Sequence, residues 1–251
     1  MIFLVIILVL FIIYFRLYLY LFPKHRLIIL MYHKVEKEAE DELTVSVENL
    51  EKQFKYLREK KYRSLFFKDI QSESRKKIII TFDDGYYNNY EFLPALLEKY
   101  DLKAIIFIST GFIENGYHEN KMMSFEDLKN LNPNFFEIAL HSHLHQNFRT
   151  LNIREIEKDL IANMQILESH QINYSKIVAY PYGKYAKNKE NQNLLFYTLK
   201  KLGIDFAVRI GNKINYFPNA QPYELCRIDI KGGDSLQKFK IKLILGKLKF
   251  F

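Results

Sequence analysis

The segment "KKIIITFDDG", residues 76–85, runs from an apolar, β-rich stretch directly into two carboxylates and a glycine. A short apolar run that ends in such a turn is typical of a buried strand, since glycine lets the chain bend sharply at low steric cost. Amphipathic stretches such as 47–61 and 153–171 carry apolar residues at helical spacing. Five further apolar runs are expected to be strands: 26–33, 103–109, 136–140, 176–180 and 205–210. Strands alternating with helices predict an α/β fold with a parallel sheet or barrel.

The composition is that of a single folded domain. Apolar residues make up 49% and aromatic residues 16% of the 251 positions, which excludes a disordered or fibrous chain. No repeat or flexible linker marks a second domain. The single Cys226 excludes an intrachain disulfide. A net charge of +8 favours an anionic neighbour such as a membrane surface, and no motif for a nucleic-acid partner is present, so none is expected.

Residues 1–23 are almost wholly apolar and match the length of about 20 residues that a membrane-spanning helix needs. Bulky residues precede Pro23 and no basic region precedes the run, so we expect a retained transmembrane helix instead of a cleaved signal peptide. A buried core helix is the alternative. Basic residues at 24–26 place the main domain, 27–235, on the cytoplasmic side of the cell membrane by the positive-inside rule.

The last stretch, 236–251, combines lysines with apolar residues at helical spacing. It is expected to form a basic amphipathic helix, either as the final helix of the domain or lying on anionic lipid headgroups.

Polar residues and one proline stand at the C-terminal ends of four predicted strands, where parallel α/β folds bind ligands and perform chemistry. They are His33, Asp83, Asp84, His141, Pro181 and Tyr182. The segment "LHSHLHQN", 140–147, adds two more histidines at positions 143 and 145. The joint pattern predicts one functional edge.

Catalytic zinc usually has three protein ligands drawn from His, Asp, Glu and Cys. His141 and His145 would share a side of a helical turn, whereas His141 and His143 would share a face if the strand continued. Of the adjacent Asp83 and Asp84, one carboxylate can bind the metal and the other can take a proton from water. The alternatives are a solvated histidine loop and an ordinary Asp-Asp-Gly turn.

These residues resemble the polysaccharide deacetylases with a NodB homology domain, carbohydrate esterase family 4. The motifs "TFDDG" (81–85), "HSHLH" (141–145) and "YPYG" (180–183) match that family in order. With "LIILMYHKV" (27–35), the resemblance extends over about residues 27–235. It implies an irregular (β/α)7 TIM-like barrel, here preceded by the N-terminal transmembrane helix.

The resemblance also implies roles for individual residues. Asp84, His141 and His145 are the expected metal ligands, His143 is not a ligand, and Asp83 is the general base. The backbone N–H of Tyr182 is the expected oxyanion donor. The expected ion is Zn²⁺, with Co²⁺ and Ni²⁺ as alternatives.

Two departures from the family pattern concern the support of catalysis. Ala179 stands where many members carry an arginine that orients the catalytic aspartate, and no histidine follows His170 to protonate the leaving amine. Either His33, His143 or His118 replaces this acid, or water does, or the enzyme is impaired. The residues expected to bind substrate or to support the catalytic groups are His33, Tyr180, Pro181, Arg209 and Arg227, the two arginines being candidates for the missing guanidinium.

The sequence therefore predicts a membrane-anchored, metal-dependent hydrolase that removes N-acetyl groups from amino sugars. Its substrate would be a cell-surface polysaccharide or a lipid-linked glycan, and the anchor favours the latter. A deformylase or O-ester hydrolase could use the same metal site. A carbohydrate-binding pseudoenzyme and a structural membrane protein without metal are alternatives of other classes. The oligomeric state is not predicted.

Overall fold

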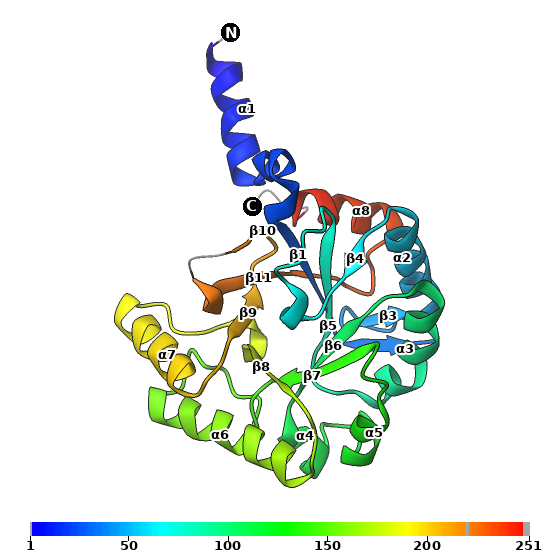
Figure 1. Cartoon of the computed structure of the whole chain (residues 1–251), viewed down its shortest axis with the longest axis vertical. Coiled ribbons are helices and arrows are strands. Elements are labelled where there is room, and N and C mark those ends of the chain that lie inside the picture. The colour runs from blue at the N-terminus through cyan, green and yellow to red at the C-terminus, as the bar shows by residue number, and fades with distance from the viewer. Residues whose placement is uncertain (1, 219–220, 248–251) are drawn as a thin grey trace.

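The computed structural model describes residues 2–218 and 221–247. Within these residues seven parallel strands close into a barrel, because β1 pairs with β5 on one side and with β11 on the other (Figure 1). The barrel strands are β1 (Arg26–Tyr32), β5 (Lys77–Phe82), β6 (Ala104–Ile108), β7 (Phe136–Leu140), β8 (Ser175–Ala179), β9 (Phe206–Ile210) and β11 (Leu225–Asp229). The expected (β/α)7 barrel is confirmed.

Short strands surround this barrel. β4 (Arg63–Ser64) pairs with the start of β5, β10 (Asn215–Tyr216) runs antiparallel to β1, and β2 (Lys34–Glu36) pairs with β3 (Thr44–Ser46) in a separate sheet. All six predicted strands form. The seventh, β11, was not predicted because its sequence, LCRID, carries two charged residues among five and lacks the continuous apolar run of the others.

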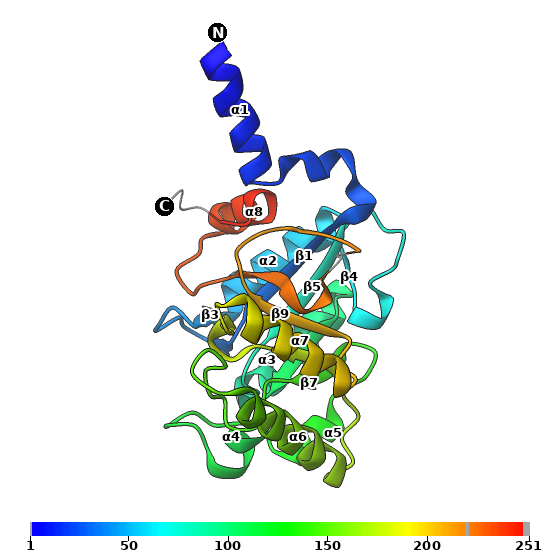
Figure 2. The ribbon, with the colours of Figure 1, turned by 90° about the vertical axis from the view of Figure 1, so that its left-hand side faces the viewer.

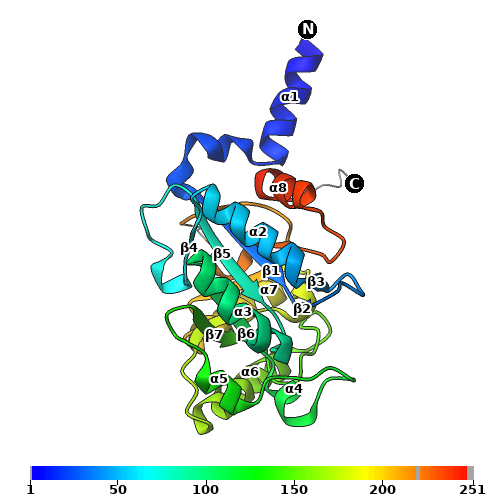
Figure 3. The same ribbon diagram turned by 90° about the vertical axis from the view of Figure 1, so that its right-hand side faces the viewer.

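Helices cover the outside of the barrel, as the side views show (Figures 2 and 3). Their bounds are α2 (Val47–Glu59), α3 (Tyr87–Tyr100), α4 (Thr110–Asn115), α5 (Phe125–Asn130), α6 (Ile153–Ser169), α7 (Lys189–Lys201) and α8 (Leu236–Leu245). Helix α2 begins after Ser46, whose hydroxyl accepts a hydrogen bond from the Asn49 N–H. It buries Leu50, Phe54 and Leu57, the face that the spacing predicts.

Side chains alternate between the barrel interior and the helix-covered exterior, as the period of a strand requires. Leu27 and Ile29 of β1, Ile79 of β5, Ala139 of β7 and Leu225 of β11 belong to the interior cluster. In steps of two, Ile79 leads to position 83, Ala139 to position 141 and Leu225 to position 227. Alternation therefore directs an aspartate, a histidine and an arginine toward the barrel axis at its C-terminal edge.

The N-terminal apolar run does not form one long helix. Helix α1 (Ile2–Tyr14) has 13 residues and projects from the domain, with none of its side chains buried (Figures 1–3). Arg16, at φ 53°, then takes the left-handed conformation, and the chain continues as two 3₁₀ turns, Leu17–Leu21 and Pro23–His25.

A helix of this length measures about 20 Å, whereas a bilayer core is about 30 Å thick. No helix among residues 2–218 and 221–247 is long and apolar enough to cross a membrane. The expected transmembrane helix over 1–23 is therefore not supported, because the turn at Arg16 divides the run. The alternative of a buried core helix does not fit either, since α1 is exposed.

Helix α8 packs against the domain through Phe239 and Leu243, which are both buried in the main core. It begins at Leu236, where the basic C-terminal helix was expected, and it behaves as the final helix of the barrel. Residues 248–251 of the expected helix lie outside the described residues.

Candidate active site

Asp84, His141 and His145 meet at the C-terminal edge of the barrel. One ligand atom from each lies within 4.8 Å of the others. The Asp84 Oδ1 atom is 3.4 Å from the Nε2 atom of His141 and 3.3 Å from that of His145, and the two Nε2 atoms are 3.2 Å apart. All three side chains are buried. These are the three residues expected to bind a metal.

The two histidines converge through an irregular turn. The loop after β7 contains two left-handed residues, Ser142 at φ 67° and His145 at φ 52°, and the Ser142 hydroxyl accepts a hydrogen bond from the His145 N–H at 3.0 Å. Neither the helical turn nor the continued strand considered from the sequence occurs. His143 points away from the cluster, and its Nδ1 lies 3.0 Å from the Thr110 hydroxyl.

The ring orientations suit a cation. The Nδ1 atom of His141 lies 2.8 Å from the Ala179 carbonyl, so an Nδ1–H donated there leaves Nε2 as a free lone pair facing Asp84. The Asp84 Oδ1 atom is buried without a hydrogen-bond partner among the described residues. A buried acceptor of this kind is costly unless something satisfies it. Two imidazoles and a carboxylate are a donor set that zinc accepts.

The protonation states of His145 and Asp84 also fit a metal site, whereas the carboxylates of Asp83 and Asp84 outweigh burial and raise the pKa of His141. Burial lowers the pKa of His145 to about 4, helped by neighbouring His141. Burial alone would raise the pKa of Asp84, but its contacts with His141, His33 and His145 outweigh burial and hold that pKa well below its usual range. At neutral pH His145 is therefore neutral and Asp84 ionised, which are the forms that bind metal.

Asp83 is held by Arg227. Two guanidinium nitrogens donate to its two carboxylate oxygens at 2.5 and 2.7 Å, and both side chains are almost fully buried, with 1% of Arg227 and 3% of Asp83 exposed. Burial raises the pKa of Asp83, but the charges of Arg227 and His141 outweigh it, so the pKa is lowered. Of the two arginine candidates, the structure brings Arg227 to the aspartate.

Arg209 lies elsewhere because of strand alternation. Its neighbour Val208 belongs to the interior cluster of the barrel, so Arg209 is on the opposite face of β9. It lines a cavity beside Gly183 instead of contacting Asp83.

The three candidate acids are placed differently. The Nε2 atom of His33 is 3.9 Å from the Asp83 carboxylate, and 15% of this side chain is exposed. His143 forms its side-chain hydrogen bond with Thr110, and the His118 ring lies 4.5 Å from the ring of Tyr117. Of the three, His33 is the one beside Asp83.

The segment Pro181–Gly183 forms a tight turn at the rim. Pro181 is buried, while Tyr182 takes the left-handed conformation (φ 57°) and has its ring 4.9 Å from that of His145. A Cβ atom on Gly183 would lie 2.2 Å from Ile210, so this close approach requires glycine. Tyr180 is fully buried and donates its hydroxyl to the Tyr223 carbonyl at 3.0 Å, which is a supporting contact away from the cluster.

Two polar residues of α6 hold the histidine loop and were not predicted. The Asp159 carboxylate accepts hydrogen bonds from the N–H groups of His143 and Leu144 at 3.3 and 2.8 Å. Asn163 donates to the Ile108 carbonyl and to the Thr110 hydroxyl. Their signal in the sequence is that both polar residues lie on the buried, apolar face of an amphipathic helix.

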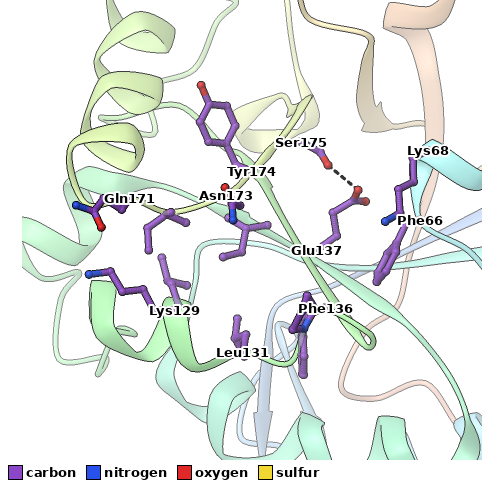
Figure 4. A pocket seen from close by; sticks show the side chains of 14 residues that line it. Phe66, Lys68, Lys129, Leu131, Phe136, Glu137, Gln171, Asn173, Tyr174 and Ser175 are labelled. Atoms are coloured by element: carbon purple, nitrogen blue, oxygen red, sulfur yellow. Dashed lines mark hydrogen bonds between the residues drawn. The ribbon is translucent and has the colours of Figure 1, made fainter.

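A cavity of about 510 Å³ lies at the opposite ends of β7 and β8 (Figure 4). Lys68, Lys129 and Glu137 line it, together with apolar residues from α5 and the loop after α6. Burial raises the pKa of Glu137, whose carboxylate accepts a hydrogen bond from Ser175 at 2.5 Å. Because the cavity is remote from the Asp-His-His cluster, it is not part of the candidate site.

Sequence comparison agrees with this geometry. The family profile described as "Polysaccharide deacetylase" matches residues 70–206, which is more than half of the chain and contains the aspartate, histidine and Pro-Tyr-Gly motifs. The chain belongs to the polysaccharide deacetylase family.

Curated relatives in this family share about a quarter of the chain's sequence. The putative polysaccharide deacetylase YxkH of Bacillus subtilis is 27% identical over 64% of this chain and 58% of its own length. The poly-beta-1,6-N-acetyl-D-glucosamine N-deacetylase of Staphylococcus aureus is 27% identical over 74% of this chain and 67% of its own length. The chain thus spans only about three-fifths of the Bacillus relative.

Solved deacetylase structures share the fold. Streptococcus pyogenes deacetylase PplD, in complex with acetate, superposes with a TM-score of 0.75 at 19% identity over 87% of this chain and 98% of its own. IcaB from Ammonifex degensii superposes with a TM-score of 0.74 at 20% identity over 87% and 97%. At these identities the likeness concerns the barrel alone.

Proposed function

We propose that this member of the family is a metal-dependent hydrolase that removes N-acetyl groups from amino sugars of a glycan. The observation that carries the proposal is the Asp84, His141 and His145 cluster within 4.8 Å, next to an Asp83 that is clamped by Arg227. A binding protein has no need of an ionised, oriented carboxylate beside a metal site. This argument favours an enzyme over a carbohydrate-binding pseudoenzyme.

Asp84, His141 and His145 would hold the divalent ion, for which Zn²⁺ is the first choice and Co²⁺ and Ni²⁺ are alternatives. When bound, such an ion supplies Lewis-acid polarisation and lowers the pKa of water toward neutrality. The protein's own groups would perform the proton transfers.

In the proposed reaction a water oxygen bonds to the acetamide carbon, and the carbon–nitrogen bond breaks to release acetate and a free amine. Asp83 accepts the water proton, since Arg227 keeps it ionised. The backbone N–H of Tyr182 would donate to the developing oxyanion. His33, beside Asp83 and partly exposed, is placed to deliver a proton to the leaving amine.

The substrate class is proposed from chemistry and from similarity. The staphylococcal relative is named for a β-1,6-linked N-acetylglucosamine polymer, so we propose an N-acetylhexosamine glycan for this chain. It would be a cell-surface polysaccharide or a lipid-linked glycan. A substrate panel that includes formylated and O-acetylated sugars distinguishes the related hydrolases that could share the metal site.

We further propose that α1 associates with a membrane. The exposed residues Ile2, Leu4, Ile6, Leu8 and Leu10 belong to an apolar surface that runs around the helix and is not confined to one face. A helix that is apolar on all sides suits lipid better than a protein groove, which would cover one stripe.

The test is an acetate-release assay on N-acetylglucosamine oligomers with and without added divalent ion. Asp83→Asn should abolish turnover but retain metal in elemental analysis, whereas His141→Ala should lose both. An Asp83→Asn protein with full activity would overturn the mechanism, and purified protein that binds no divalent ion would overturn the metal site.

A further inference from the structure

A second, smaller cavity of about 280 Å³ opens beside the turn formed by Pro181–Gly183. Gly183, which directly follows Tyr182, lines it, and the Tyr182 ring is 4.9 Å from the ring of the metal-site residue His145. Arg209 enters it from the C-terminal end of β9, the same edge of the barrel as the cluster. The cavity is thus next to the place where the reacting sugar would bind.

The lining of this cavity is strongly cationic. Its charged residues are Arg149, Lys184, Lys187, Arg209 and Glu224. They come from the loop after β7, from the segment before α7, from β9 and from the 3₁₀ turn Pro222–Glu224 just before β11. Four cations and one carboxylate, from segments that are distant along the chain, therefore line one cavity.

Within the described part of the chain, these cations are not paired with carboxylates. Across residues 2–218 and 221–247, none of the four forms an ion pair, and the Nε atom of Arg209 is buried without a hydrogen-bond partner. The one carboxylate, Glu224, accepts a hydrogen bond from Tyr185. A buried guanidinium N–H without an acceptor is costly, which points to a ligand that supplies one.

We propose that this cavity is a subsite for an anionic substituent of the glycan, a carboxylate or a phosphate group on a sugar next to the N-acetylated one. Guanidinium groups pair with both kinds of oxyanion, and ammonium groups add charge that attracts the chain. The inference rests on the proposed deacetylase function and narrows its substrate to acidic glycans.

The test compares three substrates with the full-length protein loaded with zinc. They are neutral N-acetylglucosamine oligomers, oligosaccharides that alternate N-acetylglucosamine with a uronic acid, and N-acetylglucosamine units joined by phosphodiesters. We expect a higher kcat/KM for at least one acidic substrate than for the neutral one. The preference should shrink as salt rises from about 0.05 to about 0.5 M, because exposed charges are screened.

The variant Lys184→Gln/Lys187→Gln should lower the acidic-to-neutral ratio of kcat/KM by about tenfold, as expected for two exposed ion pairs. The matched control is Lys68→Gln/Lys129→Gln, which removes two lysines from the cavity at the other end of the barrel. This control should leave the ratio unchanged. Which acidic substrate responds identifies the anion.

Two results would overturn the subsite. One is a wild-type enzyme that prefers the neutral oligomer. The other is a Lys184→Gln/Lys187→Gln variant whose ratio equals that of the wild type or falls equally in the control. If the proposed deacetylase function itself is wrong, none of the three substrates releases acetate, so the two failures can be distinguished.

Discussion

Replacing Arg227 by methionine tests the link between the barrel interior and catalysis. Arg227 and Asp83 form a two-pronged, almost fully buried ion pair. Removing one partner of a buried pair costs about 3–5 kcal/mol, because the other charge is left without compensation. For a chain of this size the melting temperature should fall by about 10 °C. The variant should still fold, since methionine fills much of the same space.

The pH dependence follows from the direction of the Asp83 pKa. In the wild type this pKa is depressed, so the stability that it contributes is present above the usual value for aspartate and is lost as pH falls through the folded-state pKa. In Arg227→Met we expect burial to dominate and to raise the Asp83 pKa, so stability is instead lost as pH rises from the usual value for aspartate to the raised folded-state pKa. The stability gap between the two proteins should be wide at neutral pH and should narrow in acid.

Activity should follow the same titration. Without Arg227 the Asp83 carboxylate is less ionised and is no longer held in position, so kcat/KM on N-acetylglucosamine oligomers should fall at least about tenfold. The acid limb of the pH–rate profile should move to higher pH, and alkaline conditions should recover part of the rate.

The measurements are acetate release across pH and thermal unfolding by circular dichroism. Arg227→Lys is the comparison variant, because it keeps the charge but loses the two-pronged geometry, and it should fall between the other proteins. A folded Arg227→Met protein with the wild-type rate and an unmoved acid limb would refute the proposed role of the ion pair.

Further expectations concern the metal, the turn and α1. Chelation of the metal should lower the melting temperature measured by calorimetry, and added zinc should restore that temperature. The lost free energy of stabilisation should be about 2.7 kcal/mol if the ion was present at a hundred times its Kd. Gly183→Ala should reduce kcat and destabilise by about 1–3 kcal/mol or more in denaturant titrations, because a Cβ would lie 2.2 Å from Ile210 at φ +60°. Gly203→Ala is its control: φ is +72°, but no atom lies closer than 3.5 Å, so strain acts without a clash. Ile6→Asp/Leu8→Asp should abolish cosedimentation with anionic vesicles and leave acetate release from soluble oligomers unchanged; cosedimentation equal to wild type would contradict lipid contact by α1.

Most of the barrel was predictable because its strands are buried on both faces. Every residue of β5 is buried, and such a strand must be apolar throughout, so it is visible as a continuous run. β11 escaped prediction for the opposite reason. The charge of its inward side chain, Arg227, is compensated by Asp83, which is distant in the sequence. The local sequence pattern therefore does not show that this charged residue belongs to a buried strand.

The candidate metal ligands were predicted as a set, but their local geometry was not. The sequence places His141 and His145 four residues apart, which suits a helical turn, while the observed loop relies on left-handed residues at Ser142 and His145. That loop is held by Asp159, a side chain from a later helix. Tertiary hydrogen bonds of this kind override the local preference, and spacing alone does not reveal them.

The local sequence does not show which of Arg209 and Arg227 faces the barrel interior. Both arginines lie in short strands, and strand alternation turns one into the barrel and the other outward. The phase of that alternation is fixed by which neighbours pack inside, here Leu225 for β11 and Val208 for β9. Because each strand has apolar side chains on both faces, the sequence does not show the phase.

The placement of α1 bears on which glycan the enzyme would meet. Arg26 begins β1 at the base of the N-terminal segment, and His33 follows the other end of the same strand beside Asp83. Seven residues of strand separate these ends by about 23 Å. If α1 lies in lipid, the candidate site and its cationic cavity open on the side of the barrel away from that surface. This geometry favours a polymer chain over a sugar held at the membrane, contrary to the sequence-based preference for a lipid-linked glycan.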